Sequence, residues 1–122
     1  MKLTQDAPGA QHGITGYGPD HVAINKALHH HNLIVLPGAL IAPWAASLEH
    51  LAPEDWAPLL PLRPEVVLLG TGTRQRFPAP QVLRPLIEAG IGVEVMDLPA
   101  ACRTYNILMS EGRLVAAALL LR

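Results

Sequence analysis

Two short apolar runs separated by an amphipathic stretch give the chain its clearest pattern. The runs cover residues 66–69 and 93–96, and residues 81–89 between them repeat apolar side chains with a helical period that stops at Gly90. Glycine often ends a helix because it adopts the left-handed conformation without strain. Strand, helix and strand in this order predict a βαβ unit, with both strands parallel in one sheet.

The predicted helix at 81–89 has a buried and an exposed side. Its period turns Leu83, Leu86 and Ile87 toward the sheet. Pro85 lies inside this stretch. Because proline removes a backbone hydrogen bond, we expect it to kink the helix.

The loops that follow two parallel strands emerge at one edge of the sheet. In this chain they are residues 70–75 and 97–106. Open α/β sheets tend to bind their ligands at the carboxyl ends of the strands. We therefore expect any functional site of this chain at that edge.

The first half of the chain predicts further strands. His21–Asn25 alternates between polar and apolar residues, which predicts a half-buried strand, and Leu33–Leu36 predicts a strand covered on both faces. Residues 26–32 between them form either a hairpin loop or extensions of both strands. Pro53 marks the start of a short helix that contains Trp56.

A second helix is predicted at residues 99–111, ended by Gly112, and residues 113–121 predict a closing strand. Tyr105 shares the apolar face of this helix, so its ring should be buried and its hydroxyl should have a partner. Arg103 lies about 160° around the helix from Tyr105, and it should be exposed.

Length and composition predict one ordinary globular domain. The chain has 122 residues, 50% of them hydrophobic, and a formal net charge of −1. We expect the domain at residues 14–122, after a loosely ordered segment at residues 1–13. Without a basic excess, nucleic acid is not an expected partner.

Several features predict a cytoplasmic protein. The single Cys102 excludes an internal disulfide and fits a reducing compartment. Residues 1–20 contain no apolar signal region. The longest apolar tract, at residues 33–48, is broken by Pro37 and Pro43 and is short for a membrane span.

The 70–75 loop, Gly-Thr-Gly-Thr-Arg-Gln, lacks both common nucleotide-binding signatures. Gln75 stands where the dinucleotide fingerprint has its third glycine, and no Gly-Lys-Ser/Thr is present. Three arginines and no acid occur from residue 66 to residue 87. Together with glycine and threonine donors they could bind an anion. The alternative is a tight glycine turn with solvated arginines.

Cys102 and Asp97 each have two interpretations. Cys102 lies in the first turn of the predicted helix beside Arg103, which favours a thiolate, but a catalytic cysteine also needs a base that the sequence does not identify. A buried, inert thiol is the alternative. Asp97 could act as a general base, but its position before the helix already explains it as an N-cap.

The run His29–His31 is the obvious candidate for a metal site. Consecutive residues of a strand point to alternating faces, so at most two of them could share an ion. Cysteines and carboxylates are absent at ligand spacing nearby. We expect no metal, no cofactor and no catalytic residue, since the common hydrolase signatures are also absent.

The chain resembles a known family in several short blocks and two glycine turns, namely Met96-Asp97, Ala101-Cys102-Arg103-Thr104-Tyr105-Asn106, Glu111-Gly112-Arg113, Gly16-Tyr17-Gly18 and Gly70-Thr71-Gly72. It is similar to the small single-domain family of unknown function whose mitochondrial members include respiratory complex I assembly factor three.

The resemblance implies an α/β, three-layer (β/β/α) fold around a mixed sheet. It also implies a protein partner, such as a respiratory-chain subunit, and no established enzymatic reaction. A transit peptide is not recognisable, which points to a bacterial relative. Leu98 stands where family members often carry Thr.

Two functions fit these features. The first is a non-catalytic protein-binding or assembly module that docks its partner at the predicted edge. The second is a small-molecule binding protein or enzyme that holds an anion there. A pocket lined by Arg74, Arg103 and Asp97 would favour the second, and a flat apolar rim the first. The candidate binding residues are glycine and polar positions of the two loops: Gly70, Thr71, Gly72, Thr73, Arg74, Asp97, Arg103 and Asn106.

Overall fold

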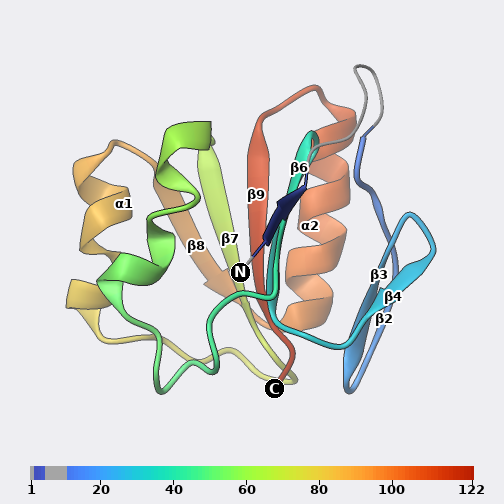
Figure 1. Cartoon of the computed structure of the whole chain (residues 1–122), viewed down its shortest axis with the longest axis horizontal. Helices are drawn as coiled ribbons and strands as arrows, with labels where there is room; N and C mark the ends of the chain where they lie inside the picture. Colours follow the sequence, from blue (N-terminus) through green and yellow to red (C-terminus); the bar gives the residue numbers. More distant parts are fainter. Residues whose placement is uncertain (1, 5–10) are drawn as a thin grey trace.

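The computed structural model describes residues 2–4 and 11–122, which form two β-sheets and several helical segments (Figure 1). The larger sheet has six strands, in the order β1 (Lys2–Thr4), β6 (Ala39–Ala42), β5 (Leu33–Leu36), β9 (Val115–Leu120), β7 (Val66–Thr71) and β8 (Gly92–Met96). Its strands β9, β7 and β8 are parallel neighbours, and the remaining pairs are antiparallel.

The smaller sheet is antiparallel and consists of β2 (Ile14–Gly18), β3 (His21–Ile24) and β4 (Ala27–His29). Asn25 and Lys26 make the turn between β3 and β4, with φ angles of 49° and 73°. Residues 27–29 therefore form a strand of their own that turns back along β3. Residues 26–32 are thus neither a single hairpin loop nor an extension of both flanking strands, the two alternatives that the sequence left open.

The predicted βαβ unit is confirmed, because β7 and β8 are adjacent parallel strands with Val67 opposite Val93. The helix between them differs from the prediction. It is a 3₁₀ turn, η3 (Pro80–Leu83), followed by a five-residue helix, α1 (Arg84–Glu88). Each piece has a proline in its first turn, where the missing N–H costs no hydrogen bond.

Two predictions for this crossover were wrong. Pro85 does not kink a longer helix but lies at the start of α1. Ile87 is 63% exposed, whereas Leu86 is completely buried. The change from 3₁₀ to α geometry shifts the angular positions of the side chains, so a single helical period did not identify the buried face.

The first helical segments are short 3₁₀ turns, η1 (Pro53–Trp56) and η2 (Leu60–Leu62). Trp56 is completely buried, and its ring centroid lies 5.1 Å from that of Trp44. Its indole N–H donates to the carbonyl of Val82 in η3, at 3.0 Å. This bond links the loop before β7 to the crossover after it.

The larger sheet has a hydrophobic core on each face. Alternating residues of its central strands pack on one face against α1, η1 and η3, with Trp56 and Leu86 in this core. The other face packs against α2 (Leu98–Ser110) and the smaller sheet, with Tyr105 and Val22 in that core. The predicted α/β class, mixed sheet and single domain are confirmed.

Helix α2 begins and ends as its sequence predicts. The carboxylate of Asp97 accepts a 2.8 Å hydrogen bond from the amide of Ala100, which makes Asp97 the N-cap. Gly112 follows the last turn with φ +79°, and its amide donates to the carbonyl of Met109. Tyr105 is completely buried, and its hydroxyl donates to the carbonyl of His12 at 2.7 Å.

The expectation of a loose segment at residues 1–13 falls mostly outside the described residues, since residues 1 and 5–10 are not described. Within this range, strand β1 pairs with β6. His12 is buried, and its amide donates to the carbonyl of Pro37.

Replacing Tyr105 by Ala should lower the free energy of unfolding by about 3–5 kcal/mol, the range for buried aromatic rings. The change leaves a cavity against the central strands and deprives the His12 carbonyl of its donor. Arg103→Ala, on the exposed side of α2, should change stability by less than about 0.5 kcal/mol. Chemical denaturation compares both variants with wild type, and equal losses would contradict the assignment of the two faces.

Gly70→Ala should cost about 1–3 kcal/mol because the site is already filled. The new Cβ would lie 3.0 Å from the Cβ of Ala101 and 3.1 Å from a methyl group of Leu119. Gly38→Ala is the matched control, since no atom lies within 4 Å of its new Cβ. If thermal denaturation finds Gly70→Ala as stable as Gly38→Ala, α2 does not depend on close contact with β7.

Candidate functional site

Three parallel strands end together at one edge of the larger sheet. Strands β7, β8 and β9 run in the same direction, so their carboxyl ends lie at the lower end of the molecule in Figure 1. The two predicted loops meet there, because the amide of Leu98 donates to the carbonyl of Gly72 at 2.7 Å. The expectation that both loops share one edge is confirmed.

Thr71 is buried and organises the loop after β7. Its hydroxyl donates to the carbonyl of Arg74 at 2.7 Å and lies 3.3 Å from the carbonyl of Met96, at the end of β8. The same oxygen accepts the amide of Arg76 at 2.9 Å. Thr71 therefore holds the loop in shape and presents no free hydroxyl to a ligand.

Gly70 and Gly72 are also buried. Gly70 lies in close contact with α2, as described above. Gly72 has φ +76°, and a Cβ there would lie 2.9 Å from the backbone of Arg122. Glycine is required at this position both by the left-handed backbone conformation and by the close backbone of Arg122.

Asn106 joins α2 to the smaller sheet. Its side-chain amide donates to the carbonyl of Ile14 at 2.7 Å, and its oxygen accepts the amide of the same residue at 3.0 Å. Both ends of the side chain are thus engaged by one backbone position of β2. Asp97, the N-cap, is similarly engaged by the backbone of α2.

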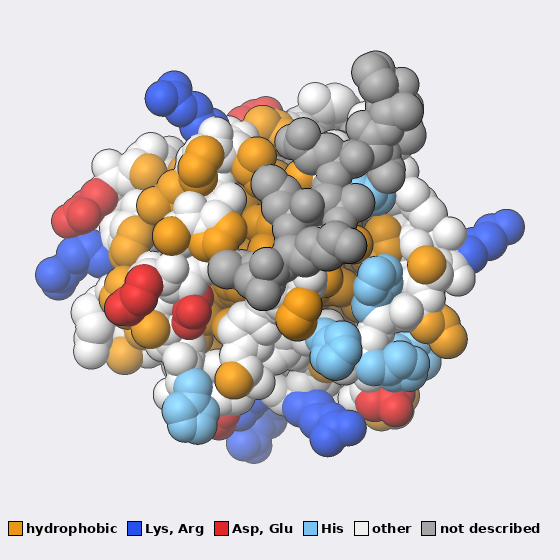
Figure 2. All heavy atoms as spheres, viewed as in Figure 1, with side chains coloured by type: hydrophobic (Ala, Val, Ile, Leu, Met, Phe, Trp, Pro, Cys, Tyr) orange, Lys and Arg blue, Asp and Glu red, His pale blue; other side chains and the backbone are white. Residues whose placement is uncertain are grey.

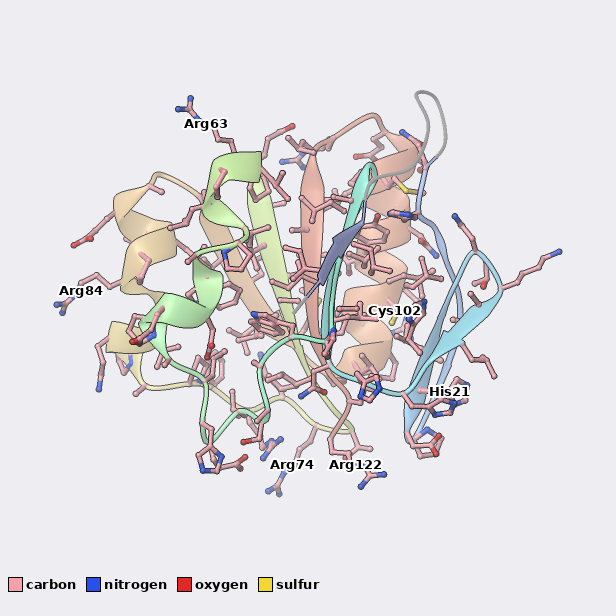
Figure 3. The ribbon with its side chains drawn as sticks, in the orientation of Figure 1. His21, Arg63, Arg74, Arg84, Cys102 and Arg122 are labelled. Atoms are coloured by element: carbon pink, nitrogen blue, oxygen red, sulfur yellow. The ribbon has the colours of Figure 1, made fainter. Side chains whose placement is uncertain are left out.

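The predicted site residues that present side chains to solvent are Thr73, Arg74 and Arg103. Nη1 of Arg103 lies 3.4 Å from the hydroxyl of Tyr17, in β2. Figure 3 shows Arg74 extending from the lower end of the molecule, where Arg122 also lies.

An apolar slot of about 230 Å³ opens at this edge. Its walls come from three parts of the chain: the turn between β2 and β3, the loop after β7 with the end of β9, and the first turn of α2. The side chains that line it are those of Tyr17, Pro19, Thr73, Leu98, Pro99 and Leu121.

A second pocket, the arginine pocket, adjoins the slot and has a volume of about 350 Å³. It shares Pro19, Thr73 and Leu121 with the slot and adds three arginines to them, Arg74, Arg76 and Arg122. Of these, Arg76 is already engaged: it donates to Glu49 and to the carbonyl of Arg122, both at 3.0 Å.

A larger hollow, of about 680 Å³, lies beside the arginine pocket and is lined by both polar and apolar groups. Figure 2 shows histidines gathered near the lower right of this view, and His30 and His31 line the hollow. Many of its polar groups have partners already. Asn32 donates to the carbonyl of Ala45, and Glu49 pairs with Arg76. We therefore regard the smaller apolar slot as the better candidate for binding.

The run His29–His31 does not assemble a metal site. Across residues 2–4 and 11–122, no cluster of three or more His, Cys, Asp or Glu side chains could hold a metal ion. His29 is half-buried, and its pKa is lowered chiefly by desolvation, with smaller contributions from neighbouring histidines.

A family model described as "Protein of unknown function (DUF498/DUF598)" matches residues 14–120 of the chain. The chain belongs to this family. The resemblance seen in the glycine turns and in the Arg103–Asn106 block is thereby confirmed.

Two curated relatives are named NADH dehydrogenase (ubiquinone) 1 alpha subcomplex assembly factor 3. The protein from Bos taurus is 33% identical over 120 residues, which is 97% of this chain and 65% of the relative. The protein from Danio rerio is 37% identical over 122 residues, which is 98% of this chain and 70% of the relative. The chain thus spans about two thirds of each of these relatives.

The fold is also found in a crystal structure of a protein from Bordetella parapertussis. Its TM-score is 0.84 and its sequence identity 39%, over 93% of this chain and 98% of that chain. Among the described helices of this DUF498/DUF598 member, none is long and apolar enough to cross a membrane.

Sequence reasoning missed four residues of the edge: Tyr17, Pro19, Leu121 and Arg122. Tyr17 lies in the first glycine turn and Pro19 follows it, and the other two residues lie at or just after the end of the predicted closing strand. The Ala- and Leu-rich composition of β9 was the available signal. A strand whose residues are all buried belongs in the middle of a sheet, so its end should lie beside that of β7.

Cys102 has the properties of the inert alternative. It is 1% exposed, and burial raises the pKa of its thiol to about 12, although Arg103 opposes this shift. It also lines a small pocket of about 120 Å³ together with Arg103 and Asn106. At neutral pH the thiol is protonated, which removes the thiolate that a nucleophile needs.

This raised pKa predicts a loss of stability in alkali. The ordinary pKa of the thiol is 9.0, so between about pH 9 and pH 12 the unfolded chain loses a proton that the folded chain keeps. The free energy of unfolding is unaffected by Cys102 below this window and falls as the pH rises through it.

From pH 8 to pH 10, wild type should lose about 1.4 kcal/mol more stability than Cys102→Ala, which lacks this titration. Urea denaturation of both proteins at the two pH values measures the difference. Tyr105 is present in both, so its own raised pKa does not affect the comparison. Equal losses would show that Cys102 ionises as easily in the folded protein as in the unfolded chain.

Proposed function

We propose that this chain is a non-catalytic protein-docking module that acts in the assembly of a multi-subunit enzyme. We further propose that it holds its partner at the edge where β7, β8 and β9 end. The relatives named as assembly factors support the first part. The apolar slot supports the second and is the observation on which the proposal rests.

The size of the slot fits a side chain better than a small molecule. Pockets for drug-sized ligands usually measure about 300–1,000 Å³. A slot of about 230 Å³ is smaller, and it holds a large apolar or aromatic side chain of a partner protein. Protein interfaces commonly concentrate their binding energy in one such buried anchor.

The surroundings of the slot suit an interface. Tyr17 is 41% exposed, which is a large exposure for an aromatic residue. Arg103 lies against its hydroxyl. Tyrosine and arginine are enriched among the residues that dominate protein–protein binding, because each combines an apolar stem with directional hydrogen bonds.

The alternative of a small anionic ligand has less support. Arg74 lines the arginine pocket, Arg103 lines the small pocket beside Cys102, and Asp97 caps α2. These three residues, which the sequence analysis expected to line one anion-binding pocket, therefore do not line any one of these pockets together.

The first turn of α2 is also unavailable to an anion. The amide of Leu98 is bound to Gly72, and the amides of Ala100 and Ala101 are bound to Asp97. Pro99 has no N–H to offer. A helix N-terminus attracts anions through free amides, and in α2 these amides are occupied.

Site-specific photo-crosslinking tests the docking function. A photoreactive amino acid at Thr73, exposed at the slot, should yield a discrete adduct with a subunit or assembly component of a multi-subunit enzyme in cells of the native organism. The control carries the same group at Arg84, an exposed position of α1, which Figure 3 shows well apart from Arg74 and Arg122.

Denaturing gels and mass spectrometry identify the adducts. An adduct that forms at Thr73 and not at Arg84 supports docking at this edge. If Thr73 gives no adduct, or both positions give the same one, the proposed function is wrong.

A further inference from the structure

Arginines lie beyond both ends of the apolar slot. At one end, the slot is walled by Tyr17, whose hydroxyl is in contact with Arg103. At the other end, Leu121 lines both the slot and the arginine pocket, where Arg74 and Arg122 lie. Figure 3 shows Arg74 and Arg122 at the same lower end of the molecule. An occupant of the slot therefore has a guanidinium group within reach on either side.

Three acids near this edge, among the residues that the structure describes, have hydrogen-bond partners. Asp20 pairs with His21 at 3.1 Å, Glu49 pairs with Arg76 at 3.0 Å, and Asp97 accepts the amide of Ala100 at 2.8 Å. The pKa of Asp20 is lowered chiefly by its hydrogen bond with His21, and that of Glu49 chiefly by a backbone hydrogen bond. The carboxylates of Asp20 and Glu49 are therefore ionised at neutral pH, and all three acids already have a hydrogen-bond partner.

The arginines beside the slot have no such partners. Within the described part of the chain, Arg74, Arg103 and Arg122 each lie beyond ion-pair distance of every acid. The guanidinium groups of these three arginines are therefore without a carboxylate partner among the described residues. A guanidinium group presents a planar fork of N–H donors that matches a carboxylate.

We propose that this edge recognises a protein segment in which one apolar side chain is flanked on both sides by carboxylates. The apolar side chain fills the slot. One carboxylate meets Arg103, and the carboxylates on the other side meet Arg74 and Arg122. This proposal rests on the proposed docking function and specifies the chemistry of the partner at the same site.

A phage-displayed library of random twelve-residue peptides tests this specificity with the full chain as the target. The enriched peptides should contain a Leu, Ile, Met or Phe with Asp or Glu on both sides. A synthetic peptide of the enriched sequence should bind with a Kd that rises at least about fivefold between 50 and 500 mM NaCl, because salt screens contacts between exposed charges.

Paired charge reversals locate the contact. The double variant Arg74→Glu/Arg122→Glu should raise the Kd of the synthetic peptide at least tenfold. The control is the double variant Arg63→Glu/Arg84→Glu, which makes the same change in net charge at two exposed arginines elsewhere, both labelled in Figure 3. It should raise the Kd of the peptide less than twofold. Arg74→Lys/Arg122→Lys should raise the Kd less than the reversal does, because lysine keeps the charge but lacks the bidentate fork. Circular dichroism confirms that each variant is folded.

Three results would overturn the proposal: no enriched peptides, enriched peptides without flanking acids, or equal weakening by the two double reversals. The photo-crosslinking experiment separates this failure from that of the docking function. A partner captured at Thr73 through a segment without carboxylates overturns only the proposed specificity. The absence of any adduct at Thr73 contradicts the docking function itself.

Discussion

Helix α2 lies against the central strands because the residues at this contact are small. A Cβ at Gly70 would lie 3.0 Å from the Cβ of Ala101, so the two backbones meet with no room for a larger side chain. This close packing brings the first turn of α2 to the end of β7, where Leu98 bonds to Gly72. The inner walls of the apolar slot are a direct result. A bulkier residue at position 70 would move the helix and widen or close the slot.

Local pattern predicted the elements whose structure depends on neighbours in sequence. The strands at 66–69 and 93–96, the N-cap Asp97 and the buried Tyr105 all follow from hydrophobic period and capping chemistry. The crossover helix was less predictable, because two prolines divide it into a 3₁₀ turn and one short α-helix. The exposure of Ile87 follows from that division.

The composition of the candidate site depends on contacts across most of the chain, which local pattern does not encode. Tyr17 reaches Arg103 across 86 residues, and Leu121 is fixed by the side chain of Asn32 across 89 residues. The sequence located the edge through its two loops. It did not predict which distant segments complete it, nor that Thr71 and Asn106 would be occupied by backbone groups.

The outer wall of the slot belongs to a different part of the structure from the inner walls. The end of β2, with Tyr17, and the turn after it, with Pro19, belong to the smaller sheet, which Asn106 fastens to α2. Neither Tyr17 nor Pro19 belongs to the two hydrophobic cores. Substitutions in this turn can therefore reshape the slot while both cores stay intact. The inner walls include Leu98 and Leu121, which belong to one core, so the outer wall is the part of the slot that sequence change can alter at little cost to folding.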